Sequence, residues 1–202
     1  MGLFDIFKRQ PPIRDAAALA EFIDGNAAFV TQKGLYEYSR VRAGHYAKVL
    51  FKEQAFQDAI EHARWCAFPI GLAMVAEVVD SVLHGDSTAG RAANLQQLHE
   101  LVLSIFDRYP VPPSIGAGPW RAARDDLDRR LKLIGVHPPK RAMDIQEPYA
   151  QAYFDTMPIH QQLRGRDFPT TQNYLKVTLC NVHDDLSKRI DRVALGAQPT
   201  AA

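Results

Sequence analysis

The longest helical pattern in the 202-residue sequence covers residues 53–83 and sets the strongest constraint on the fold. In its first half, apolar residues recur at the spacing of one helix face, namely Phe56, Ala59, Ile60 and Ala63. The second half is apolar nearly all round, which is typical of a helix that other elements surround. Its most apolar run, residues 65–76, is shorter than the roughly 20 residues that a membrane-spanning helix needs. We therefore predict a central buried helix, kinked or split in two at Pro69.

A second clear pattern lies near the C-terminus. Apolar residues there advance by 4, 3, 4, 4 and 3 positions, which predicts an amphipathic helix over 171–193 that buries Leu175, Leu179, Val182, Leu186, Ile190 and Val193. Weaker patterns predict helices over 15–24, where Gly25 and Asn26 end or bend the first helix, and over 27–42, 91–108, 119–134 and 148–156. No alternating β pattern competes with them. The sequence thus predicts an all-α fold, a compact bundle of about six to seven helices with a long proline-punctuated irregular segment at 136–170.

The chain is expected to form one folded unit with a short tail at each end. We predict a single helical domain over 14–195, a flexible apolar and basic tail at 1–13, and a disordered tail at 196–202. Hydrophobic residues make up 47% of the sequence, which is typical of a globular domain. The net charge of +1 gives no overall attraction to nucleic acid, so none is expected as a partner. Two cysteines form no disulfide scaffold, and no secretory signal is recognised, so we expect a cytoplasmic protein.

Short motifs that mark common catalytic sites are missing from the sequence. It has no glycine-rich phosphate-binding loop, no serine nucleophile elbow, and none of the paired His and Glu patterns of zinc or di-iron enzymes. These absences favour a non-catalytic protein. Four groups of residues nevertheless carry side chains suited to chemistry or binding.

The first group is two pairs of Cys and His. His62 and Cys66 are four residues apart in the central helix, and Cys180 and His183 are three apart in the last helix, so each pair shares a helix face. If those faces meet, thiolate and imidazole ligands converge as in a tetrahedral zinc site. The simpler interpretation is a small buried cysteine with two boundary histidines, because Cys180 lies well off the apolar stripe of its helix. We expect no cofactor, with a single zinc ion as the alternative.

The second group is Glu77, Asp80 and His84, at positions i, i+3 and i+7 of the central helix. Two acids and a histidine along one side of an apolar helix are candidate catalytic residues for general acid–base chemistry. The alternative, which we favour, is a solvent-facing strip near the end of the helix, where His84 also suits the negative end of the helix dipole.

The third group belongs to the irregular segment 136–170. Long loops in compact helical domains are often functional, so this segment is a candidate binding surface. Acidic residues balance its basic ones, which equally fits an ordered wrap whose aromatic side chains cap one end of the bundle. The binding surface would comprise the aromatic and basic side chains of the segment, Lys140, Arg141, Tyr149, Tyr153, Phe154, Arg164, Arg166 and Phe168.

The fourth group is the N-terminal tail. Four large apolar residues precede two basic ones there, a composition that favours contact with an anionic membrane surface if the tail is helical: Leu3, Phe4, Ile6, Phe7, Lys8 and Arg9. Docking onto a groove of the same protein is the alternative. A protein with this tail would lie in the cytoplasm, at the inner face of the membrane.

Taken together, these patterns predict a non-catalytic helical adaptor or assembly protein that acts through protein–protein contacts, peripheral to the membrane if the tail binds it. The alternative function is a metal- or small-ligand-binding helical protein, or an enzyme, that uses the carboxylate and His group or the Cys and His group. A protein partner is expected in the first case.

Overall fold

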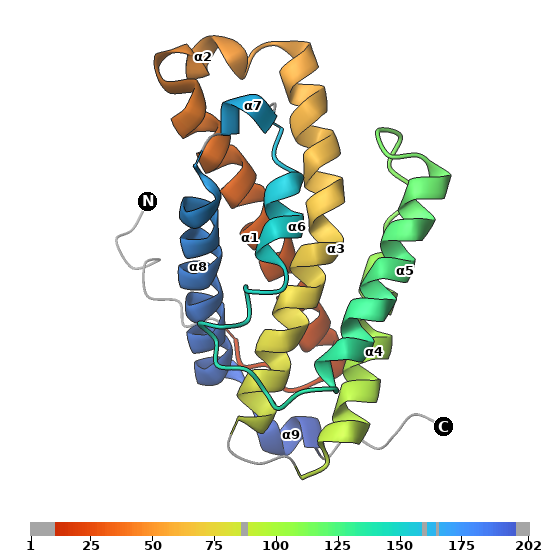
Figure 1. Ribbon diagram of the computed structural model, residues 1–202. Helices are drawn as coiled ribbons and strands as arrows, with labels where there is room; N and C mark the ends of the chain where they lie inside the picture. Colours follow the sequence, from red (N-terminus) through yellow and green to blue (C-terminus); the bar gives the residue numbers. More distant parts are fainter. Residues whose placement is uncertain (1–10, 86–88, 159–160, 165, 197–202) are drawn as a thin grey trace, which may run out of the picture.

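The computed structural model describes residues 11–85, 89–158, 161–164 and 166–196 and confirms the predicted all-α bundle (Figure 1). Its elements are, in chain order, α1 (Ala16–Ala43), the 3₁₀ turn η2 (Gly44–Tyr46), α2 (Ala47–Leu50), α3 (Gln54–His84), α4 (Arg91–Asp107), α5 (Ala117–Ile134), α6 (Ala150–Asp155), α7 (Gln161–Arg164), α8 (Phe168–Arg189) and α9 (Arg192–Gly196). Within these described ranges no β-strand forms, and a single isolated bridge pairs Ile13 with Ile190.

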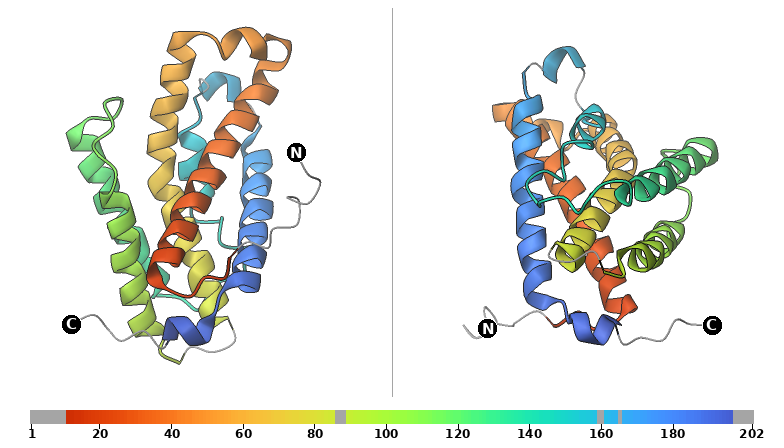
Figure 2. Two further views of the ribbon diagram at one scale, coloured as in Figure 1. Left: turned by 180° about the vertical axis from the view of Figure 1, so that it is seen from behind. Right: turned by 60° about the horizontal axis from the view of Figure 1, so that its bottom comes forward.

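Helix α3 is the centre of the bundle, as the sequence predicts. It packs against α1, α8, α5 and α4, and the short α6 lies on it as well (Figures 1 and 2). By length and composition alone α3 is able to cross a membrane, but 89% of its most apolar window is buried within the protein. Burial by neighbouring helices removes the apolar surface that a bilayer would otherwise cover. The apolar character of α3 is therefore that of a core helix.

Helix α1 is continuous, and the predicted break at Gly25 and Asn26 is wrong. Asp15 caps its start as expected, with its Oδ1 accepting a hydrogen bond from the Ala18 amide at 2.7 Å. A glycine inside a helix costs only about 1 kcal/mol. The Asn26 side chain also stays within the helical pattern, because its amide donates to the Phe22 carbonyl at 2.9 Å. Packing along α3 outweighs these local signals.

Helix α3 also continues through Pro69, so it is not split in two. Two residues further on, Gly71 lies where α3 meets α1. A Cβ atom at Gly71 would lie 2.7 Å from Thr31 Cγ2 and 2.8 Å from the Ala27 carbonyl oxygen. Only a glycine allows the two backbones to approach this closely without displacement.

The predicted last helix ends earlier than its apolar stripe. Ile190 is extended, with ψ 126°, and the chain then forms the separate helix α9. The Ile13 amide donates to the Arg189 carbonyl and the Asp191 amide donates to the Ile13 carbonyl, both at 2.9 Å. Ile13 is also fully buried. The start of the folded domain therefore includes Ile13, which the sequence had placed in the tail.

Candidate functional site

The carboxylate and His row of α3 is buried, so the favoured expectation of a solvent-facing strip is wrong. Glu77, Asp80 and His84 are 4%, 2% and 5% exposed. Burying a carboxylate is costly unless a cation and hydrogen-bond donors accompany it. The partners come from segments beyond α3, where helical spacing in the sequence does not reveal them.

Glu77 is held by the connector between α5 and α6. Lys140 Nζ lies 2.9 Å from Glu77 Oε2, and the Tyr149 hydroxyl donates to Glu77 Oε1 at 2.6 Å. Tyr149 is itself buried, with Arg130 and Lys140 over its ring. Burial and the adjacent carboxylate raise the pKa of the Tyr149 hydroxyl well above its usual value.

Asp80 forms a bidentate ion pair with Arg91 at the start of α4. Arg91 Nε and Nη2 donate to the two Asp80 oxygens at 2.9 and 2.8 Å. The same guanidinium donates to the carbonyls of Ile134 and His137. The His84 ring contacts the Asn94 amide at 3.2 Å. The hydrogen bonds of Asp80 and His84 therefore hold α4 and the end of α5 against α3, and so stabilise the fold.

The segment 136–170 is mainly a wrap over α3 and α8, so the predicted exposed binding surface does not form as one patch. Tyr149, Tyr153 and Phe154 are buried, and the Tyr153 hydroxyl donates to the Thr31 carbonyl at 2.9 Å. Arg164 is also buried and donates to the carbonyls of Phe154, Asp155 and Met157, near the end of α6.

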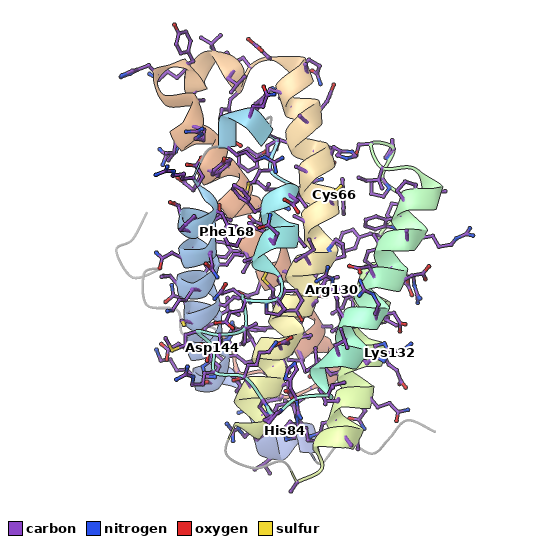
Figure 3. All side chains as sticks on the ribbon, viewed as in Figure 1. Cys66, His84, Arg130, Lys132, Asp144 and Phe168 are labelled. Carbon is purple, nitrogen blue, oxygen red and sulfur yellow. The ribbon has the colours of Figure 1, made fainter. Side chains whose placement is uncertain are left out.

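The remaining members of that group are scattered. Lys140 pairs with Glu77, Arg141 is exposed beside Asp144, Arg166 is exposed, and Phe168 is half-buried against Phe154 at the start of α8 (Figure 3).

A basic pocket lies where this wrap meets the C-terminal ends of α3 and α8. Its volume is about 440 Å³. Its ionisable lining residues are all basic, namely Lys140, Arg141, His183 and Arg192, and the described residues that line it include no carboxylate. Ser81 and Ser187 also line it, and the Ser81 hydroxyl donates to the Lys140 carbonyl at 2.7 Å. Lys140 and Arg141 carry acidic partners outside the pocket, so the excess positive charge is concentrated on Arg192.

The predicted zinc ligands do not converge. In the part of the chain that the structure describes, no group of three or more His, Cys, Asp or Glu side chains is placed to hold a metal ion. Cys66 lies in the first half of α3, towards the end opposite to His84 (Figure 3). His183 faces the basic pocket instead. The helix faces that carry the two pairs do not meet, so the single-zinc alternative loses its ligand set.

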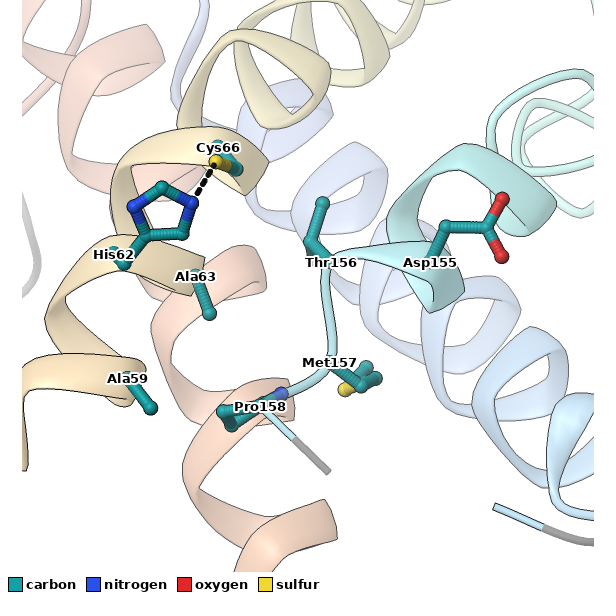
Figure 4. Close-up of a pocket in the computed structure, with 8 residues that line it drawn as sticks. All are labelled: Ala59, His62, Ala63, Cys66, Asp155, Thr156, Met157 and Pro158. Atoms are coloured by element: carbon teal, nitrogen blue, oxygen red, sulfur yellow. Dashed lines mark hydrogen bonds between the residues drawn. The ribbon is translucent and has the colours of Figure 1, made fainter. Parts of the chain in front are cut away.

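His62 and Cys66 nevertheless form a close pair at a pocket of about 560 Å³. Cys66 Sγ lies 3.5 Å from His62 Nε2, and His62 Nδ1 lies 2.8 Å from the Ser114 carbonyl oxygen. Figure 4 shows this pair on one wall of the pocket and Thr156, Met157 and Pro158 on the opposite wall. Partial burial raises the pKa of the Cys66 thiol.

One corner of the molecule gathers exposed apolar side chains. Of eleven large hydrophobic residues that are exposed among those described, five lie between residues 29 and 49: Phe29, Tyr36, Val41, Tyr46 and Val49. We define residues 36–52 as the α1–α2 corner, at the top of Figure 1. Val41, Tyr46 and Val49 are 73%, 77% and 59% exposed.

The α1–α2 corner is also basic. It carries four Lys or Arg residues and one acid, Glu37. Arg40 pairs with Glu37 and Arg42 with Asp167, whereas Lys48 and Lys52 have no ion-pair partner among the described residues. The net charge of +1 for the whole chain conceals this cluster. A shorter window would have revealed the charge, but only the structure shows that the apolar side chains are exposed.

The N-terminal residues predicted to touch a membrane, Leu3 to Arg9, lie outside the described residues, so that expectation stays a prediction. Comparisons with known proteins add no constraint: no protein-family model, no curated protein and no solved structure matches this chain.

Proposed function

We propose that this protein is a helical adaptor or assembly protein that docks onto an acidic surface of a partner protein through the α1–α2 corner. The observation that carries the proposal is that exposed Val41, Tyr46 and Val49 lie beside Lys48 and Lys52, which have no ion-pair partner among the described residues. Exposed apolar side chains with a rim of one charge sign are typical of a protein-interaction site. Most of the aromatic and basic side chains of segment 136–170 are instead buried in the wrap or ion-paired within the protein.

A partner protein suits the corner better than a membrane does. Each Lys near an anionic membrane contributes about 1 kcal/mol, so Lys48 and Lys52 together give only about 2 kcal/mol. The exposed side chains are Tyr and Val, whereas membrane-surface helices favour Trp, Phe and Leu. Tyrosine, by contrast, is enriched at protein interfaces, where its ring packs and its hydroxyl bonds. Membrane contact remains a separate proposal for residues 3–9 of the N-terminal tail.

Photo-crosslinking inside cells tests this proposal. A photoreactive amino acid replaces Tyr46, and the crosslinked partner is identified, purified and bound to the protein in solution. We expect Lys48→Glu with Lys52→Glu to weaken that complex about tenfold or more, a loss of about 1.4 kcal/mol or more. Rising salt should weaken it as well.

The matched control combines Arg121→Glu with Lys176→Glu. It makes the same change of net charge at two cations without an ion-pair partner among the described residues. A complex that tolerates the corner variant, or that the control weakens equally, contradicts the proposal. So does a corner that crosslinks to no protein.

The basic pocket supports a second candidate function, binding of a small anion. The side chains of Lys140, Arg141 and Arg192 line about 440 Å³ with no carboxylate among the described lining residues, which favours a phosphate or carboxylate group. Phosphate and citrate, titrated separately by calorimetry, distinguish the two anions. We expect Arg192→Ala to abolish binding and Arg121→Ala to leave it unchanged; binding that survives Arg192→Ala contradicts this function.

A further inference from the structure

We propose that Cys66 is a nucleophilic thiol, with His62 as its general base, and that it undergoes exchange with a low-molecular-weight disulfide entering the pocket in Figure 4. Three observations carry this inference. The sulfur lies 3.5 Å from a ring nitrogen, the ring is oriented by a second hydrogen bond, and a pocket of about 560 Å³ adjoins the pair. A nucleophile, a base and a group that orients the base are the parts of an activated thiol.

The contact with Ser114 assigns the protons of the His62 ring. A backbone carbonyl oxygen only accepts hydrogen bonds, so His62 Nδ1 at 2.8 Å from it carries the hydrogen. In the neutral ring Nε2 then carries the lone pair. Nε2 is also the nitrogen that faces Cys66 Sγ, so the thiol donates to it. The loop before α5 thereby sets the ring as a proton acceptor for the sulfur.

The exchange balances with the disulfide as the only co-reactant. His62 Nε2 takes the thiol proton while Cys66 Sγ attacks one sulfur of the disulfide. A new sulfur–sulfur bond forms and the original one breaks. The departing thiolate then takes the proton from His62, so the products are a mixed disulfide on Cys66 and one free thiol. Proton removal by the base matters here because burial keeps the resting sulfur in its thiol form.

The pocket suits a small and largely apolar group. Ala59, Ala63, Met157 and Pro158 provide apolar walls, and the volume lies within the usual range for small-molecule sites. The charged group that lines it, Asp155, turns its carboxylate away from the pair (Figure 4).

The other ionisable groups on this stretch of α3 are already bonded. Asp58 accepts from Gln54, and Glu61 pairs with Arg64. The His62 ring is therefore the base placed to receive the thiol proton.

Single-cysteine variants of the full chain test the inference. Cys180→Ser retains Cys66, and Cys66→Ser retains Cys180, which lies on a helix and is half-buried like Cys66. Each variant reacts with excess dithiodipyridine, an aromatic disulfide without carboxylates, and the release of thiopyridone is followed by its absorbance from pH 5.5 to 9. We expect Cys66 to react about tenfold or more faster than Cys180 at pH 7.5, because general-base assistance speeds proton transfer.

Replacing the base separates reactivity from folding. In the Cys180→Ser background, His62→Ala should slow Cys66 about tenfold and leave a profile that follows thiol ionisation alone. Free imidazole should restore part of the rate, which repair of a packing defect does not predict. A circular-dichroism melt of each variant checks folding. Equal rates for the two cysteines, or a Cys66 rate and pH profile that His62→Ala leaves unchanged, would overturn the inference.

Discussion

The ion pair between Asp80 and Arg91 offers the sharpest test of how α4 is held on α3. Its side chains are 2% and 11% exposed, and two hydrogen bonds of 2.9 and 2.8 Å join them. Asp80→Asn keeps the shape but removes the negative charge, so the Arg91 guanidinium stays buried without a counter-ion. Removing one partner of a buried ion pair typically costs about 3–5 kcal/mol. At about 2–4 °C of Tm per kcal/mol for a chain of this size, Tm should fall by roughly 6–20 °C.

Urea unfolding, followed by circular dichroism, measures this loss. Asp184→Asn is the control, because its pair with Lys188 is 67% and 70% exposed and should change stability by less than about 0.5 kcal/mol. Asp80→Leu combined with Arg91→Met should recover part of the loss, since no charge then remains buried. Recovery stays incomplete because the carbonyl of Ile134 loses its donor. A cost below about 1 kcal/mol for Asp80→Asn, or a double variant as unstable as the sum of its parts, would refute the reasoning.

Three further predictions concern packing and titration. Gly71→Ala should destabilise the protein by about 1–3 kcal/mol, because the added methyl group overpacks against α1. Gly25→Ala, with nothing within 4 Å of its Cβ, should instead stabilise it by up to about 1 kcal/mol. Equal effects of the two substitutions in urea unfolding would contradict the close approach of α3 to α1 at Gly71. Ile13→Ala should cost about 2–5 kcal/mol if Ile13 belongs to the core, and less than about 0.5 kcal/mol if it is part of a tail. Burial lowers the pKa of His183 in the folded state, so the unfolded chain binds this proton more readily, and stability should decline as pH falls through about 6.5. His183→Gln should flatten that decline in thermal melts from pH 7.5 to 5.5. An unchanged slope would contradict the assignment of the decline to His183.

The candidate sites show which contacts a single sequence predicts and which it does not. The spacing of His62 and Cys66 correctly indicates a shared helix face, and the two side chains are within 3.5 Å. Spacing does not reveal the Ser114 carbonyl 52 residues away, which assigns the ring protons. The same limit applies to Glu77, whose partner Lys140 is 63 residues away. A pattern along one helix identifies a face, but the groups opposite that face come from elsewhere in the chain.

The sequence by itself determined the helical class, the central place of residues 54–84 and the cap at Asp15, because helical periodicity and capping depend on residues within a few positions of each other. Tertiary structure decided that α1 runs unbroken past Gly25, that the acidic row of α3 is buried, and that the segment after α5 is a wrap. Each of these depends on contacts between distant segments, whose free energies exceed local preferences of about 1 kcal/mol. The central helix is thus predicted by its own residues, while its partners are set by the fold.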